Sequence, residues 1–204
     1  MRVLLLSVLI LYYLLLIPVG LSEAADLDSV IRDISKDFRP ILGHLVTAQK
    51  AIYIDVGSKE GVRPGDMFSV FVTQGQIEMG QKKKPSKRRY AGTILVEKVE
   101  ETRSICTVLK RERPLPNGSE VERFSGLRAA ILGLDSNIPS ELMQLQMRLK
   151  KELWWFEWVD DEALPTSLDS MEDLSRYKLD IAFVISTSGV LVYRAPKVLM
   201  GNYP

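Results

Sequence analysis

The spacing of apolar residues predicts a helix near the start of the chain. Between Asp26 and Phe38 the apolar positions recur every three or four residues, as on one face of a helix. Aspartates at the start of this stretch suit an N-cap, and Pro40 ends the helix because it lacks a backbone N–H group. We therefore assign residues 25–42 to an N-terminal helix.

From residue 43 the apolar residues alternate with polar ones, which is typical of strands. Six short segments rich in Val, Ile, Thr, Tyr and Phe are separated by Gly, Pro and Asn: residues 44–48, 51–56, 67–72, 90–99, 102–110 and 119–124. Closely spaced strands with turn signals are typical of a compact barrel. The sequence predicts a small six-stranded β-barrel over residues 43–124.

The link between the second and third predicted strands contains Gly57, Gly61, Gly65 and Asp66. A phosphate-binding loop would need a Gly-Lys pair and a following helix, and the sequence has neither. Gly57 and Gly61 fit a chain reversal, Pro64 and Gly65 fit a tight turn, and the Asp66 carboxylate can accept hydrogen bonds from turn amides. We interpret these residues as a structural corner of the barrel.

The pattern after residue 126 predicts a second module. Its segments are a strand at 127–135, a helix at 139–153, a strand at 154–159, a short helix at 167–177 and a strand pair within 178–195. This β-α-β-α-β-β order indicates an α/β layered module over residues 127–195, so the whole chain is of the α+β class. Residues 196–204 either complete this sheet or form a tail or linker.

The predicted barrel resembles the C-terminal barrel of the flagellar assembly protein T family. The likeness runs from Gly43 to Phe124 and is carried by the motif GSKEGVRPGDMFSVF at residues 57–71 and by NGSEVERF at residues 117–124. The second module resembles, in the order of its elements, the N-terminal domain of the TolB family and the middle domain of the flagellar assembly protein T family. These resemblances imply an assembly or scaffolding role in a bacterial cell envelope.

The pattern of residues 1–24 predicts a signal peptide. Arg2 precedes an apolar run from Val3 to Ile17 that contains one polar residue, Ser7, and small residues before Ala24 offer a cleavage site. The run is short for a membrane-spanning helix, which needs about 20 apolar residues. We expect a periplasmic or secreted protein that is cleaved near Ala24, with a retained membrane anchor as the alternative.

The formal net charge is only +1, but basic residues gather in one tract. This tract contains Lys82, Lys83, Lys84, Lys87, Arg88 and Arg89 and no acidic residue. Mutual repulsion favours a solvated loop between two strands, and contact with an anionic surface or an acidic partner is the functional alternative. We expect no nucleic-acid binding, because aromatic residues are not interleaved with the cations.

Residues suited to catalysis are few and scattered. His44 and Cys106 are the single histidine and cysteine, so the chain has no internal disulfide, and we interpret Cys106 as a small buried thiol. Residues 160–162 are consecutive acidic residues in a polar turn and read as solvated charge. We therefore predict no catalytic set, no metal site and no cofactor.

An aromatic run, Trp154-Trp155-Phe156-Glu157-Trp158, offers a candidate contact surface. On a strand, Trp155 would face away from the other three rings. One face then packs in the core, while an open aromatic patch would bind protein. Trp155 and Trp158 are the candidate partner-contact residues.

These observations lead to a non-catalytic exported protein that acts through contacts with envelope proteins, such as a flagellar or outer-membrane assembly. Two alternatives stay open beside it. One is a periplasmic ligand-binding module with a crevice at the strand ends of the α/β module, or the first part of a longer TolB-like propeller protein. The other is an electrostatic binder that acts through residues 82–89.

Overall fold

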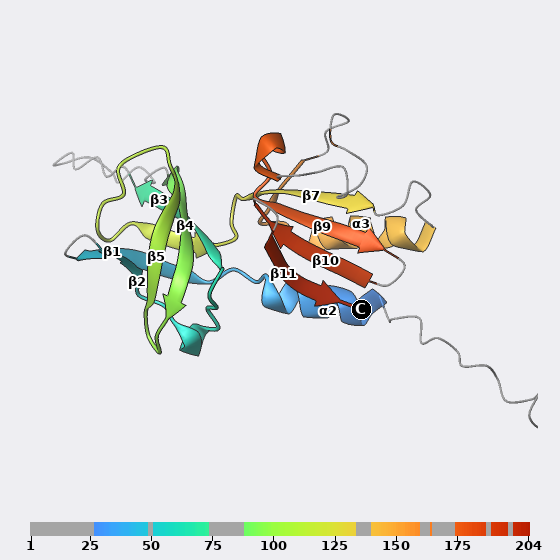
Figure 1. Cartoon of the computed structure of the whole chain (residues 1–204), viewed down its shortest axis with the longest axis horizontal. Coiled ribbons are helices and arrows are strands. Elements are labelled where there is room, and N and C mark those ends of the chain that lie inside the picture. The colour runs from blue at the N-terminus through green and yellow to red at the C-terminus, as the bar shows by residue number, and fades with distance from the viewer. Residues whose placement is uncertain are drawn as a thin grey trace, which may run out of the picture.

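The computed structural model describes residues 27–48, 51–73, 88–133, 140–159, 164, 174–186, 189–195 and 198–204. These residues form a closed barrel and a five-stranded sheet that lie side by side along the long axis of the molecule (Figure 1). The α+β class expected from the sequence is confirmed. The predicted signal peptide, residues 1–24, lies outside the described residues.

The barrel consists of six antiparallel strands: β1 (Leu42–Ala48), β2 (Ala51–Ile54), β3 (Met67–Thr73), β4 (Arg88–Val99), β5 (Ser104–Arg111) and β6 (Glu120–Arg123). Their order is β1-β2-β5-β4-β3-β6, and β6 pairs back onto β1. Closure leaves none of these six strands at an edge. Inward-facing residues such as Leu45, Phe68 and Ile94 are fully buried and fill the interior. The predicted six-stranded barrel is confirmed.

The second module contains β7 (Arg128–Gly133), α3 (Ser140–Glu152), β8 (Glu157–Trp158), the short 3₁₀ helix η3 (Leu174–Tyr177), β9 (Ile181–Ser186), β10 (Gly189–Arg194) and β11 (Val198–Tyr203). The strand order is β11-β10-β9-β7-β8. Strand β7 is parallel to β8 and β9, whereas β9, β10 and β11 form an antiparallel meander. The parallel pairing of β7 and β8 follows from the helix α3 that connects them.

The N-terminal helix α2 (Leu27–Asp37) packs on the sheet of the second module, although the barrel follows it in sequence. Its buried residues Val30, Ile31 and Ile34 belong to one apolar cluster with Leu149 of α3 and Phe183 of β9. Helix α2 also contacts α3 and β11 (Figure 1). The barrel is therefore inserted in the chain between α2 and the sheet that α2 covers.

Parts of the second module differ from the sequence prediction. Residues 198–203 form strand β11 rather than a tail, because they pair with β10 from Val190↔Tyr203 to Arg194↔Val198. The predicted strand at 154–159 shrinks to β8, because the chain turns after α3 and the Phe156 amide donates to the Leu153 carbonyl at 3.2 Å. Of the predicted helix at 167–177, residues 174–177 form η3, and residues 167–173 lie outside the described part of the chain.

Candidate functional site at the junction of barrel and sheet

The corner predicted between β2 and β3 lies where the barrel meets the sheet. After β2 the chain forms the 3₁₀ turn η1 (Ser58–Glu60), and the Gly57 amide donates to Glu60 Oε2 at 2.7 Å. A Cβ atom on Gly57 would lie 2.3 Å from the backbone oxygen of Glu100 and 2.7 Å from the amide nitrogen of Arg103. Glycine is therefore required at position 57 because the β4–β5 connection passes too close for any side chain.

A tight turn follows at residues 63–66. The Asp66 amide donates to the Arg63 carbonyl at 3.1 Å, and Gly65 has a φ of 92°. Pro64 and Gly65 thus occupy the two central positions of a type II pattern, in which glycine supplies the positive φ. The Arg63 amide in turn donates to Asp66 Oδ2 at 2.9 Å. Gly61, whose carbonyl faces the junction, connects η1 to this turn.

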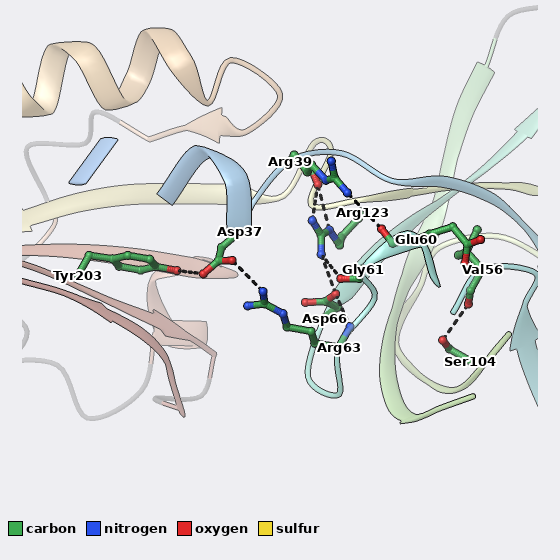
Figure 2. Close-up of polar contacts among 10 residues, drawn as sticks. All are labelled: Asp37, Arg39, Val56, Glu60, Gly61, Arg63, Asp66, Ser104, Arg123 and Tyr203. Carbon is green, nitrogen blue, oxygen red and sulfur yellow. Dashed lines mark hydrogen bonds and ion pairs between the residues drawn. The ribbon is translucent and has the colours of Figure 1, made fainter. Parts of the chain in front are cut away.

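Arg123, at the end of β6, joins the corner to the segment between α2 and β1. Its guanidinium donates to Asp66 Oδ2 at 3.0 Å and to the Gly61 carbonyl at 3.2 Å. It also donates twice to the Arg39 carbonyl, at 3.0 and 2.7 Å. Figure 2 shows the Arg123 side chain between these acceptors. The Arg123 and Asp66 side chains are 3% and 8% exposed, so the ion pair is almost fully removed from water.

Burial controls the electrostatics of this pair. It raises the pKa of the Asp66 carboxyl, while attraction to Arg123 and the hydrogen bond from the Arg63 amide oppose the rise. It also lowers the pKa of the Arg123 guanidinium, against the attraction of Asp66. Each group therefore depends on the other to keep its charge in a poorly solvated place. The arrangement is suited to fixing two parts of the chain rather than to moving protons.

A second polar connection runs beside the first. Arg63 Nη2 forms an ion pair with Asp37 Oδ1 at 3.0 Å, and the Tyr203 hydroxyl donates to Asp37 Oδ2 at 3.0 Å (Figure 2). Asp37 ends α2, Arg63 belongs to the barrel corner and Tyr203 ends β11. Burial, followed by the hydrogen bond with Asp37, raises the pKa of the Tyr203 hydroxyl. The barrel corner is thus connected to both the helix and the edge strand of the second module.

A cavity of about 370 Å³ opens at this junction. Its lining includes Asp37, Arg63, Asp66, Arg194 and Tyr203 together with apolar residues of β11. These five polar side chains are all engaged with protein groups, since Arg194 Nη1 donates to the Ala195 carbonyl at 3.3 Å. The polar side chains that line the cavity are thus held in place by bonds within the protein.

The predicted aromatic contact residues lie partly in the core. Trp155 and Trp158 are half-buried against the cluster that contains Phe183, and Trp158 Nε1 donates to the Leu153 carbonyl at 3.2 Å. The buried Trp155 Nε1 has no hydrogen-bond partner among the described residues. The exposed ring is that of Trp154, at 75%. Sequence reasoning missed it because residues 154–159 were all treated as a strand, whereas residues 154–156 form the turn after α3. A partner contact at Trp155 and Trp158 stays a prediction.

The basic tract falls mostly outside the described residues, which include neither Lys82, Lys83 and Lys84 nor Lys87. Arg88 and Arg89 open strand β4. The Arg88 guanidinium pairs with Glu120 at 3.1 Å and with Glu122 at 3.0 Å, and it lies 4.2 Å from the ring centroid of Phe71. Arg88 is therefore engaged with the barrel itself, whereas Arg89 is exposed.

The single cysteine and histidine, which were considered for catalysis, lie apart in surroundings that favour a structural role. Burial raises the pKa of the Cys106 thiol to about 12, so the thiol is protonated near neutral pH. His44 is exposed and its Nδ1 lies 3.1 Å from Asp55 Oδ2. Residues 160–162 fall outside the described part of the chain, as do the residues that directly follow β7 and β9, where a ligand crevice was expected. Within the part that is described, no three His, Cys, Asp or Glu side chains are grouped as metal ligands.

Arg123 was not found by sequence reasoning, although a signal for it exists. In β6 the inward positions alternate, and Arg123 lies two residues after the buried Val121. A strand period of two therefore places an arginine on the core side of the barrel. A charged residue at such a position needs a buried partner of opposite charge.

Comparison with known families identifies part of the barrel. Residues 49–116 match the family model of the flagellar assembly protein T, C-terminal domain. The matched residues include strands β2 to β5 and the whole corner from Gly57 to Asp66. No curated protein matches the chain. The resemblance of the second module to the TolB family stays a prediction. Among the described residues, none of the helices has the length and apolarity required to cross a membrane.

Proposed function

We propose that the chain is an exported, non-catalytic component of an assembly in the bacterial cell envelope, and that it acts through protein contacts. The observation that carries this proposal is the match of residues 49–116 to a flagellar assembly domain, within a closed barrel. The apolar run at residues 3–17 supports export. A flagellar or outer-membrane assembly is the proposed partner.

The junction supports a scaffolding role because it fixes the barrel to the sheet. Arg123 bonds at once to the barrel corner and to the segment that follows α2, and Asp37 bonds to both the corner and β11. A scaffold must hold its contact surfaces in a constant relation. Buried polar groups favour one geometry over others in some proteins, and we extend that role to this pair.

The outer wall of the barrel offers a surface for such contacts. Val46, Tyr53 and Ile105 lie opposite one another on β1, β2 and β5. Val46 is 39% exposed, and Leu109 farther along β5 is 49% exposed. We call Val46, Tyr53, Ile105 and Leu109 the barrel row. Exposed apolar groups that gather on one wall are typical of protein-binding surfaces.

The test is genetic complementation in the source bacterium. Cells that lack the chain should assemble fewer flagella, counted by electron microscopy, and the wild-type chain should restore the number. The chain with Val46→Lys in the barrel row should restore fewer flagella than the wild-type chain. Thr73→Lys is the matched control, because Thr73 is exposed on β3, which does not neighbour β1, β2 or β5 in the described barrel order. Normal flagella without the chain would contradict the proposal.

A further inference from the structure

Helix α3 has apolar side chains on two opposite sides. Leu145, Leu149 and Leu153 are almost fully buried against the sheet. Met143 and Met147 are one helical turn apart on the other side and are 59% and 68% exposed. Trp154 follows two turns after Met147. The Leu153 amide donates to the Leu149 carbonyl, so the helical hydrogen-bond pattern continues to the residue before Trp154. We call Met143, Met147 and Trp154 the α3 face.

The charges around the α3 face are mainly positive. Between residues 143 and 154 the chain has the cations Lys150 and Lys151, the cation Arg148, which is paired with Asp28, and one acid, Glu152. At 100° per residue, Glu152 lies about half a turn around the helix from Met143, whereas Lys150 and Lys151 flank the α3 face on its two sides. Lys151 is exposed. The surface is thus apolar at its centre and cationic at its border.

The α3 face also lies near the start of the described chain. Arg148 forms an ion pair with Asp28 in the first turn of α2, so α3 runs beside the N-terminal end of α2. Nine residues separate Leu27 from the apolar run that ends at Ile17. Nine extended residues span about 30 Å at most. While that run is in a membrane, α3 is therefore within reach of the bilayer surface.

We propose that the α3 face docks on the surface of a bilayer that contains anionic lipid. Tryptophan is enriched at the membrane interface, and flexible methionine side chains adapt to irregular apolar surroundings. Lysines at the border are attracted to anionic headgroups. A protein partner would need acidic groups around an apolar centre to match the same border, and the nearby apolar run favours lipid.

The test uses the full chain reconstituted into vesicles of anionic phospholipid with brominated acyl chains. Every variant carries the same apolar run at residues 3–17 and is reconstituted in the same way, so quenching of tryptophan fluorescence reports whether the three tryptophans at 154–158 approach the bilayer. Wild-type fluorescence should be quenched, and Met147→Glu should reduce the quenching at least twofold. Replacing both Lys150 and Lys151 by Glu should have a similar effect.

Leu199→Glu is the matched control, because Leu199 is an apolar residue of β11 with 54% exposure on another element. This variant should be quenched as wild type, and circular dichroism should show that all variants are folded. Absence of quenching in the wild type, or equal quenching in Met147→Glu, would overturn the proposal. So would a photoreactive residue at position 147 that captures a protein in intact cells and no lipid.

Discussion

Replacement of Arg123 by Met should destabilise the protein strongly. Arg123 is 3% exposed and makes four hydrogen bonds of 3.2 Å or less to Asp66, Gly61 and Arg39. Met fills similar space but leaves the Asp66 carboxylate buried without its counter-charge. Removal of one partner from a buried ion pair costs about 3–5 kcal/mol. We expect a loss of that size in the free energy of unfolding, measured by urea denaturation followed by circular dichroism at pH 7.

The control is Arg88→Met, which removes an arginine that is also paired with two carboxylates but is 44% exposed. Exposed pairs contribute about 1 kcal/mol or less. The penalty of Arg123→Met should also shrink in acid. Without Arg123 the folded-state pKa of Asp66 lies still further above its unfolded value, so protonation relieves the buried charge as pH falls through that raised pKa. A penalty no larger than that of Arg88→Met, or one independent of pH, would refute the reasoning.

Three further predictions concern single sites. The Cys106 thiol, with its pKa raised to about 12, should be alkylated far more slowly at pH 8 in the folded than in the urea-unfolded protein; equal rates would contradict its burial. Tyr203 should ionise at higher pH than tyrosines in the unfolded chain, and its hydrogen bond to Asp37 should stabilise the fold below about pH 10 and be lost as pH rises through the raised pKa. An absorbance titration of wild type against Tyr203→Phe checks this, and identical curves would contradict it. Gly57→Ala should lower the melting temperature more than Gly65→Ala, because the first meets backbone atoms and the second only a positive φ that costs about 1–2 kcal/mol; the reverse order would refute the corner geometry.

The elements that could be predicted from the sequence are those set by local pattern. The six barrel strands follow from period-two alternation between turn residues, and the turn with Pro64 and Gly65 follows from the φ angles that these residues prefer. Helix α2 follows from its apolar spacing. Each of these signals is contained within about a dozen residues. They can therefore be recognised in the sequence without knowledge of the distant contacts that the folded strands and helix make.

What the sequence did not predict depends on distant contacts. Arg123 and Asp66 are 57 residues apart, and Arg123 and Arg39 are 84 apart, so no local pattern pairs them. The packing of α2 on the second module is likewise decided by its apolar face, which fits the sheet and α3. At residues 154–156 the aromatic side chains favour a strand, but the turn that ends α3 overrides that preference. This override exposes Trp154 and creates the α3 face.

Site-specific photocrosslinking in intact cell envelopes tests the central claim most directly. The full chain would carry a photoreactive amino acid at position 46 in the barrel row, or at position 73 as the control, and crosslinked products would be identified by mass spectrometry. We predict that position 46 repeatedly captures proteins of a flagellar or outer-membrane assembly and that position 73 does not. Products at position 46 that do not exceed those at position 73 would contradict an assembly role for this barrel.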